Sequence, residues 1–430
     1  MDAVEILTWI SIYNNSEENY NMKKTIKLAL VASLVLGATT AFATNGTSLI
    51  GFGAKSRGMG GTGIAQFQGA ESGFNNPALI GYAKTNEASI GGTYFAPDVS
   101  IDIKNLFGPG SESKSSSASA SMIPAISTID KVNDNFAWGL ALYGVGGMGV
   151  DYRSKADGND MPNDNLLLMR FALPLSYTTS GFSIGLSPVV EYGALSMNNF
   201  FGSLGGATSD QAPNGVTTDI AYGFELGAAY QIAGVTLGLD YKSAVTHNFE
   251  NTFNSSMTPG ETQSKLDTPQ VIGAGISYEI AGNTIAFDYK NIAYSSAKGF
   301  EDFGWDDVNT FALGYEYAAE TWAVRLGYNY GAQPLPTDLD TSSAQTMNTT
   351  FAQSFGSLAA FPAVTESHYT IGGTYVFSKM VSLDAAFVYG TGSAKADYSA
   401  FAGPGTPSDT ITVEATNDQT SLTVAVNYNF

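Results

Sequence analysis

The side chains that could perform covalent chemistry are few, and their spacing builds no active site. A hydrolase needs a general base beside a nucleophile, and the chain offers two histidines for that role, His247 and His368. Neither belongs to a nucleophile-elbow sequence, and each is predicted to be a polar residue near the end of a strand. The chain has no cysteine and no His/Asp cluster with the spacing of metal ligands. We therefore predict no catalytic residue, no metal site and no cofactor.

A second pattern with chemical meaning is the spacing Gly58-x-Gly60-x-x-Gly63, which matches a dinucleotide-binding fingerprint. That fingerprint needs a strand before it and a helix after it, so that the helix N-terminus can hold the pyrophosphate. Residues 44–84 keep neither a helical nor a strand period for long. We interpret the glycines as backbone of an irregular segment that the rest of the chain encloses.

Three basic residues remain as candidates for ligand binding: Arg170, Lys290 and Arg325. Strand periodicity places them on inward faces, together with the inward charges Glu191, Glu225, Asp240, Lys242, Asp288 and Asp384. Most of these charges are expected to pair across the interior and stiffen the wall. Arg170 differs because its inward neighbours Leu168 and Ala172 are apolar. A cation in such surroundings suits an amphiphile with a carboxylate head, since a buried charge must be paired.

The elements that position these residues are strands. After residue 85 the chain repeatedly alternates large apolar with small or polar residues, for example in Leu422, Val424, Val426 and Tyr428 near its end. Together with 48 Gly, 23 Tyr, 25 Phe and only 13% charged residues, this indicates an all-β protein that packs against an apolar medium. The 39 acidic residues against 19 basic ones argue against nucleic acid as a partner.

The connections between these strands separate a membrane barrel from a secreted β-sandwich. Six short connections alternate with seven long polar ones, which together join fourteen strands. Outer-membrane barrels keep short turns at the periplasmic end and long loops outside, and an even strand number returns both termini to the periplasm. We therefore predict a 14-stranded antiparallel transmembrane β-barrel over 85–430, with residues 44–84 as an N-terminal hatch (plug) inside the lumen.

An export signal precedes the hatch. Residues 22–27 are basic, residues 28–38 are apolar, and Ala41-Phe42-Ala43 has the small-x-small pattern of a cleavage site. The apolar run is too short to span a bilayer as a helix. We predict a signal peptide at 22–43 and interpret 1–21 as a misannotated extension, with a genuine extra segment as the alternative. The predicted location is the bacterial outer membrane.

Two strands depart from simple alternation. In the first, the apolar phase changes around Ala96-Pro97-Asp98, which predicts a bulge because proline cannot donate to the ladder. In the third, the glycines Gly144, Gly146, Gly147 and Gly149 predict a kink and a gap in the wall. The last strand stops on Phe430, a pattern that resembles the one read by the outer-membrane assembly machinery.

The hatch residues resemble those of a known family. The stretches Phe52–Ala65, Asn76–Ile80 and Tyr94–Ile101, and more weakly Gly299–Trp305 and Arg325–Tyr330, are similar to the FadL family of fatty acid transporters, which includes the TodX-type aromatic hydrocarbon channels. The resemblance implies a fourteen-stranded barrel plugged by a movable hatch. It also implies a pocket beside the hatch and sideways exit at the kinked third strand. Its hatch motif corresponds to Asn76, Pro77 and Ala78, whereas no motif matches the family's carboxylate-binding residues.

We therefore predict a passive outer-membrane channel for hydrophobic compounds, with long-chain fatty acids as the leading ligand. The expected partners are these small molecules, outer-membrane lipids and, through Phe430, the assembly machinery. The alternatives are a channel for aromatic hydrocarbons, or a general porin or structural barrel in which the plug never moves.

Overall fold

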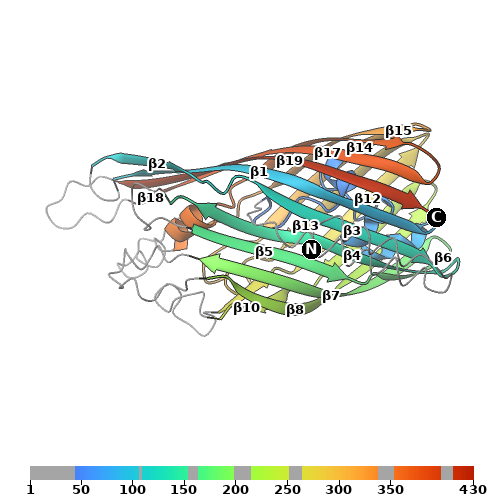
Figure 1. Ribbon diagram of the computed structural model, residues 1–430, viewed down its shortest axis with the longest axis horizontal. Coiled ribbons are helices and arrows are strands. Elements are labelled where there is room, and N and C mark those ends of the chain that lie inside the picture. Colours follow the sequence, from blue (N-terminus) through green and yellow to red (C-terminus); the bar gives the residue numbers. More distant parts are fainter. Residues whose placement is uncertain are drawn as a thin grey trace, which may run out of the picture. The chain divides into compact units, whose positions relative to one another are not determined.

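The computed structural model describes residues 44–105, 109–153, 163–197, 215–250, 264–337, 353–398 and 410–430. Most of them form one antiparallel sheet that surrounds a lumen (Figure 1). The predicted segments 1–21 and 22–43 lie outside the described residues. The strands are β1 (Glu87–Lys104), β2 (Ser111–Ser115), β3 (Ser121–Lys131), β4 (Phe136–Asp151), β5 (Asn163–Ala172), β6 (Leu175–Thr179), β7 (Phe182–Met197), β8 (Thr217–Ile232), β9 (Val235–Lys242), β10 (Val245–Asn248), β11 (Lys265–Thr268), β12 (Val271–Ile280), β13 (Asn283–Ile292), β14 (Val308–Ala318), β15 (Trp322–Gly331), β16 (Ser367–Val376), β17 (Val381–Thr391), β18 (Ser393–Tyr398) and β19 (Ile411–Asn429).

Several of these strands are pieces of a longer wall strand. Both β2 and β3 pair with β1, both β5 and β6 pair with β7, and both β17 and β18 pair with β19. Strands β10 and β11 pair with each other and continue β9 and β12. The wall therefore consists of fourteen antiparallel strands, which confirms the predicted number.

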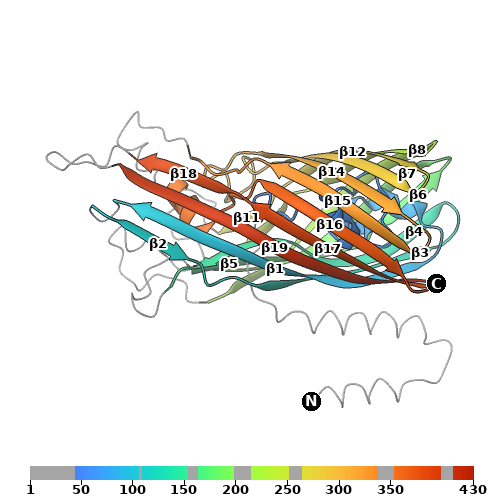
Figure 2. The same ribbon diagram turned by 90° about the horizontal axis from the view of Figure 1, so that it is seen from above.

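The barrel closes where its first strand meets its last. Strands β1 and β19 are antiparallel neighbours from the pair Glu87 and Asn429 to the pair Lys104 and Thr412. Figure 2 shows the two lying side by side along the length of the barrel. At this seam the wall has no exposed sheet edge, as a strand-built wall in lipid requires.

Tight turns join the strands at the end where the C-terminus lies (Figure 1). Ser180 and Gly181, Ala233 and Gly234, and Ala281 and Gly282 each form a pair with positive φ, between 49° and 81°. Two successive positive φ values define the type I′ turn, whose twist matches the twist of a two-residue β-hairpin. These turns lie within three of the short connections predicted for the periplasmic end.

The outward face of the wall is apolar along a broad band. Large side chains such as Tyr222, Leu239 and Trp322 are between 44% and 73% exposed there, while neighbouring residues such as Ala221, Asp240 and Ala323 point inward and are buried. A solvent-facing surface of this kind would aggregate, so the band is the face that lipid covers. Among the described residues, no helix is both long and apolar enough to cross a bilayer.

The bulge predicted at Ala96–Asp98 is absent, and this prediction was wrong. Strand β1 keeps an unbroken register with β19 through these residues, and its odd-numbered residues face inward throughout. What changes is the polarity of the two faces. Val99, Ile101 and Ile103 face the interior, whereas Asp98 and Asp102 face outward. The apolar phase changes because the upper part of the wall has an apolar inside, and sequence alternation alone does not distinguish the two faces.

Strand β19 shows the same inversion at the same height. Below Gln419 its outward residues are apolar, as in Leu422 and Val424, whereas above it the inward residues Val413 and Ala415 are apolar. Asp418 lies directly opposite Asp98 of β1. The membrane band therefore ends near this level, and above it the barrel encloses an apolar space.

The segment before β1 lies inside the barrel, as predicted. It contains the short helices α3 (Ala54–Gly58), α4 (Ser72–Asn75) and η2 (Pro77–Tyr82). Nearly all of its residues from Thr44 to Ala83 are buried. Figures 1 and 2 show this segment, in blue, between the front and rear walls. Irregular backbone is tolerated at membrane depth because the wall keeps it away from lipid. We refer to residues 44–84 as the hatch.

Candidate functional site

Charged residues of the wall hold the hatch by its backbone. The Asp288 carboxylate accepts hydrogen bonds from the N–H groups of Gly63 and Ile64, at 2.7 and 2.9 Å. Lys290 donates to the carbonyl groups of Ile50 and Gly61, at 3.3 and 3.2 Å. An irregular segment leaves such peptide groups without ladder partners, so the lumen must satisfy them. The glycine-rich stretch is therefore bound as backbone, and one predicted ligand residue, Lys290, contacts the hatch.

The predicted hatch motif joins three parts of the molecule. The Asn76 side chain accepts from the N–H of Ala78 at 3.0 Å and donates to the carbonyl groups of Ile64 and Leu239, at 2.8 and 3.2 Å. Pro77 opens η2, where its missing N–H costs nothing. Gly227 of β8 makes this approach possible, because a Cβ there would lie 2.0 Å from Asn76 Oδ1. The motif fixes the hatch to strands β8 and β9.

Arg170 is the centre of a buried group that we call the charge cluster: Arg170, Glu191, Glu225, Lys242 and His247. Its guanidinium lies 2.6 Å from Glu191 and 2.7 Å from Glu225. Lys242 pairs with Glu225 at 3.1 Å, and His247 lies 3.1 Å from Glu191. In these contacts the inward charges pair between neighbouring strands of the wall, whereas the prediction placed the pairs across the interior. A ligand role for Arg170 stays a prediction, and it would require a carboxylate to be displaced.

Arg325 lies elsewhere in the lumen. Its Nε donates to Glu316 at 2.5 Å, and its Nη1 is 3.8 Å from Asp384, which also lies 3.8 Å from Lys55 of the hatch. The structure thus does not bring the three predicted ligand-binding residues together into one site. No group of three or more His, Asp or Glu within the described ranges is arranged to hold a metal ion.

One acidic residue of the hatch is buried without a strong partner. Glu71 is 1% exposed and accepts two hydrogen bonds of 3.4 Å, from the Lys55 N–H and from Ser89. The pKa of Glu71 is raised to about 7, mainly by burial and also by the charge of Asp384, while the charge of Lys55 opposes both. Tyr82 is similarly affected, since burial raises the pKa of its hydroxyl to about 12. The docked hatch therefore favours the protonated form of Glu71.

Above the hatch lies a continuous apolar cluster, which we call the apolar interior. It extends from Phe74 of the hatch to the residues at the outer end of the barrel, Tyr294, Phe300, Trp305, Phe355, Leu358 and Phe361. Tyr143 of β4 marks its floor, with its ring centroid 4.9 Å from that of Phe52 and 4.6 Å from that of Phe74. The Tyr143 hydroxyl donates to Glu225 at 3.1 Å. Tyr143, which sequence reasoning missed, thus connects the apolar interior with the charge cluster.

The wall is incomplete beside this floor. The ladder between β3 and β4 runs from Lys131 and Ala137 up to Ala125 and Tyr143 and then stops, although β3 begins four residues earlier, at Ser121. Strand β4 continues, with a register shift against β5 between Gly144 and Gly146. Within the described residues, the chain before β3 bonds to β4 again at the outer end, where the Ser117 N–H donates to the backbone carbonyl of Asp151 at 2.8 Å. We call this unpaired stretch the β3–β4 break.

Residues of the hatch cover the break from inside. Ser48 forms an isolated bridge with Gly146, and the Gly147 N–H donates to the Thr47 carbonyl at 3.1 Å. Leu49 packs with Phe95 and Ile123 behind it. Gly146 permits this approach because a Cβ there would lie 2.5 Å from the Thr47 carbonyl oxygen. The predicted glycine-rich kink is thus the place where the hatch replaces a wall strand.

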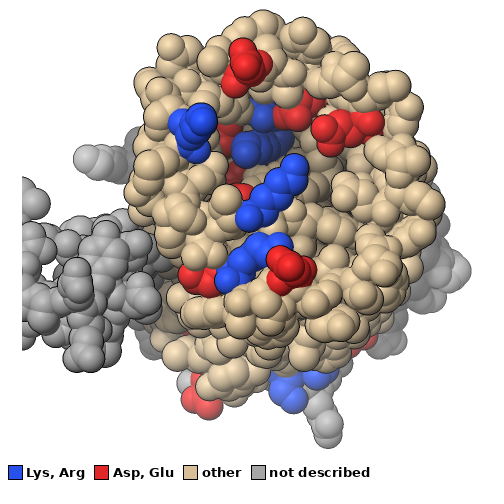
Figure 3. Space-filling model, turned by 90° about the vertical axis from the view of Figure 1, so that its right-hand side faces the viewer, with Lys and Arg blue, Asp and Glu red and all other residues tan. Residues whose placement is uncertain are grey.

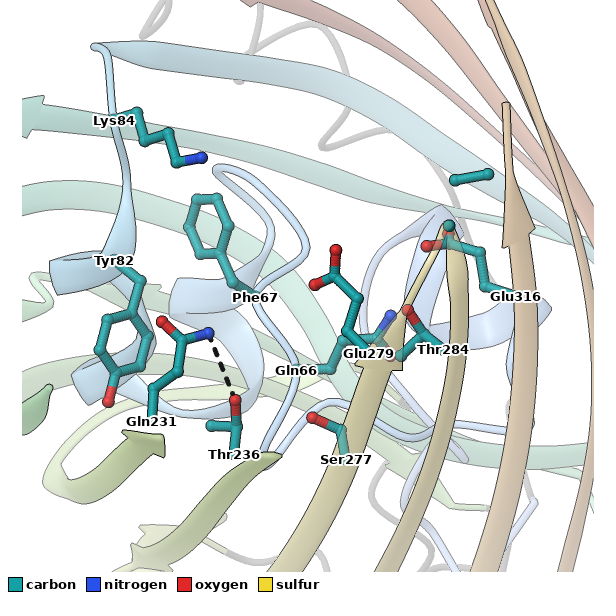
Figure 4. Close-up of a pocket in the computed structure, with 12 residues that line it drawn as sticks. Gln66, Phe67, Tyr82, Lys84, Gln231, Thr236, Ser277, Glu279, Thr284 and Glu316 are labelled. Carbon is teal, nitrogen blue, oxygen red and sulfur yellow. Dashed lines mark hydrogen bonds between the residues drawn. The ribbon is translucent and has the colours of Figure 1, made fainter. Parts of the chain in front are cut away.

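At the end with the tight turns the lumen opens into a polar hollow, seen face-on in Figure 3 with lysine and arginine side chains in it. One cavity of about 260 Å³ lies between the hatch residues Phe67 and Lys84 and the wall residues Glu279 and Glu316 (Figure 4). A second cavity of about 240 Å³ lies on the side of Lys55 and Arg325. Charged side chains line both cavities, in contrast to the apolar interior above the hatch.

The sequence of this plugged barrel matches a known family. A family model for the outer membrane protein transport proteins (OMPP1/FadL/TodX) matches residues 28–430. The chain belongs to this family. FadL/TodX proteins are outer-membrane transport proteins and not enzymes, so this protein is a transport protein of the bacterial outer membrane for hydrophobic compounds.

Individual relatives agree with this assignment. A long-chain fatty acid transport protein of Escherichia coli (strain K12) is 24% identical over 430 residues, which cover 84% of this chain and 91% of the relative. An uncharacterized protein of Chlorobium limicola is 46% identical over 83 residues, and this match covers 19% of this chain and 41% of that protein. The Pseudomonas putida toluene transporter TodX has the same fold, with a TM-score of 0.63 at 17% identity over 89% of this chain and 99% of TodX.

Proposed function

We propose that hydrophobic compounds enter this FadL/TodX protein from its outer end, bind in the apolar interior and leave sideways through the β3–β4 break into the membrane. Long-chain fatty acids are the leading ligand. The observation that supports this route best is the break itself, because a wall in lipid normally pairs every strand. Here four residues of β3 lack a β4 partner, and apolar side chains fill the space.

The polarity of the lumen supports the same route. Apolar compounds would not dissolve in a water-filled pore, whereas the interior above the hatch is lined by apolar and aromatic residues. Below the hatch the lumen turns polar, with Lys84, Glu279 and Glu316 around the cavity shown in Figure 4. A hydrophobic compound that continued along the axis would meet these charges. Sideways exit keeps it among apolar groups throughout.

Only a small part of the hatch needs to move for this exit. We call residues 44–49 the latch. Its Thr47 N–H donates to the Tyr294 hydroxyl at 2.7 Å, and that hydroxyl donates to the Asn45 carbonyl at 2.9 Å. Displacing the latch would uncover the break, while the charged wall residues would keep the rest of the hatch in place.

Aromatic hydrocarbons are a second candidate ligand. Tyr294, Phe300 and Trp305 form a compact group in the apolar interior, with ring centroids 4.7 to 5.2 Å apart. Aromatic rings favour such offset and edge-to-face contacts, and a small aromatic compound could join the group. The TodX likeness agrees with this possibility, whereas the Escherichia coli relative favours fatty acids.

Uptake by cells tests the proposed function. A strain that lacks this protein should take up radiolabelled oleate and toluene more slowly than the same strain with the gene restored. If the two strains take up each compound at the same rate, the transport role is refuted and a structural barrel with a static plug is favoured.

We further propose that the assembly machinery recognises the last strand through Phe430. Substituting this residue by Ser should then lower the amount of barrel in the outer membrane.

A further inference from the structure

Arg57 of the hatch helix α3 is a buried cation without a counter-charge. It is 2% exposed, donates to Ser421 at 2.7 Å and to the Gly51 carbonyl at 3.4 Å, and leaves its Nε without a partner. None of the described carboxylates pairs with it, in contrast to Arg170 and Arg325. Burial alone lowers the pKa of Arg57 to about 10. A buried charge is costly unless it is paired, so this guanidinium is poised for an anion.

A second unpartnered group lies beside it. His368 of β16 is fully buried, and neither of its ring nitrogens has a hydrogen-bond partner. It faces Gly390 of β17, where a Cβ would lie 2.6 Å from the imidazole. Ser421, which binds Arg57, pairs with Val388 on the same strand, two residues from Gly390. The guanidinium and the imidazole therefore reach the same patch of the wall.

This patch lies at the floor of the apolar interior. Gly390 pairs with Gln419, the residue at which β19 changes from a polar to an apolar inner face. Above that level Asn417 donates to the Pro362 carbonyl, and the inward residues Val413 and Ala415 belong to the apolar interior together with Phe361 and Val364. An amphiphile whose tail occupies the apolar interior would thus bring its head to the level of Arg57 and His368.

We propose that Arg57 and His368 bind the carboxylate of a long-chain fatty acid, and this assignment rests on the proposed function. A guanidinium can donate two parallel hydrogen bonds to a carboxylate, and a neutral imidazole can donate a third. A hydrocarbon would leave Arg57 unpaired. The site therefore selects anionic amphiphiles over uncharged compounds of similar shape. Arg170 and Arg325 do not explain such a preference because carboxylates already pair with them, and Lys290 is bound to carbonyl groups of the hatch.

The test compares oleate with oleyl alcohol, which has the same tail and a neutral head. Cells expressing wild type, Arg57→Met or Arg153→Met are given each radiolabelled compound below saturation. In Arg57→Met, loss of a hydrogen-bonded charge pair should slow oleate uptake by about ten- to a hundredfold relative to wild type. Uptake of oleyl alcohol should change by less than about twofold. Arg153→Met is the matched control, because Arg153 pairs with Asp151 at the exposed outer end. It should leave both rates unchanged.

The outcomes separate the inference from the proposed function. If wild type speeds the uptake of neither compound, the transport role itself fails. If wild type transports both compounds and Arg57→Met slows their uptake equally, or leaves both rates unchanged, Arg57 is a structural part of the hatch and the inference is wrong. Heat-modifiable gel mobility verifies that the variant barrel is folded.

Binding to the purified protein gives a readout that does not depend on hatch movement. Binding of decanoate and of decanol is measured separately by calorimetry. In His368→Leu and in Arg57→Met the affinity for decanoate should be lower than in wild type, while the affinity for decanol should be unchanged. Arg57→Lys should fall between wild type and Arg57→Met, since an ammonium keeps the charge but loses the two-pronged geometry. Equal decanoate affinity in wild type and both neutral variants would overturn the assignment.

Discussion

A disulfide across the β3–β4 break should stop transport reversibly. The chain has no cysteine of its own, so an introduced pair can form no other bridge within it. In Ile123→Cys/Gly144→Cys the new Cβ at position 144 would lie 3.8 Å from that of position 123, which matches the roughly 3.8 Å mean of natural disulfides. The close contact with Ile123 Cγ2 disappears with the isoleucine, and Gly144 does not need a positive φ. The bridge would join the two strands where their ladder is missing.

The size of the effect follows from the bonds that hold the latch. Several hydrogen bonds keep it over the break, and three of them involve its backbone: Gly147 to Thr47, Thr47 to Tyr294, and Tyr294 to Asn45, at 3.1, 2.7 and 2.9 Å. At about 1 kcal/mol each they favour the covered state by about 3 kcal/mol, so fewer than about one molecule in a hundred is open at any time. Transport depends on this small population. A covalent bridge between β3 and β4 keeps the exit closed even in this open population, so it should lower oleate uptake by more than about tenfold.

Uptake of radiolabelled oleate is measured in oxidised cells and again after a membrane-permeant reductant. Reduction should restore the wild-type rate. The matched control is Ala228→Cys/Leu239→Cys, which bridges the opposing residues of β8 and β9 where the ladder is complete. It should leave uptake unchanged in both states. If the oxidised β3–β4 variant transports oleate at the wild-type rate, the exit does not lie at the break and the lateral route is wrong.

Three further variants test the hatch. Tyr294→Phe removes the two bonds between its hydroxyl and the latch backbone, at least about 2 kcal/mol, and should raise the open population about thirtyfold or more, seen as faster oleate uptake at low concentration; unchanged uptake would show that the latch does not limit transport. Asn76→Ala with Pro77→Ala removes the Asn76 side-chain bonds to the β8 and β9 backbone and should lower uptake while heat-modifiable gel mobility stays intact; normal uptake would show that the motif has only a structural role. Glu71 favours a docked hatch when protonated, so docking should be strongest below pH 4.5, its ordinary pKa, and weaken as the pH rises through about 7. Uptake should rise over this range in wild type and stay level in Glu71→Gln, and a matching rise in the variant would contradict the role of Glu71.

The wall was predictable because connection lengths and period-two alternation are local properties. They gave the number of strands and identified the irregular hatch. The periodicity of Val99, Ile101 and Ile103 led to the wrong prediction of a bulge. Alternation shows that one face of a strand is apolar, but it does not show whether that face points to the interior or to the lipid. The inversion of polarity above Asp98 became visible only from the pairing of β1 with β19.

The site was less predictable, because its contacts join residues that are distant in sequence and lack a period. Lys290 was identified as inward, but its partners are the Ile50 and Gly61 carbonyl groups of the hatch, which no side-chain pattern announces. In the sequence, Arg57 is one residue of the glycine-rich stretch Phe52–Ala65, and no pattern marks it as a binding residue. Its importance depends on the absence of a counter-charge among the described residues around it, and a sequence does not show which charges lack partners.

The inverted polarity of the upper wall has a consequence for the direction of transport. The apolar interior lies outside the membrane, and the lipid lies beyond the break. Both are apolar environments, and on this route the latch is the barrier between them. A passive connection of this kind runs equally well both ways. Net flux is then set by whichever side removes the compound faster, so the protein itself imposes no direction. A cell that stopped consuming its ligand would leak it outward through the same opening.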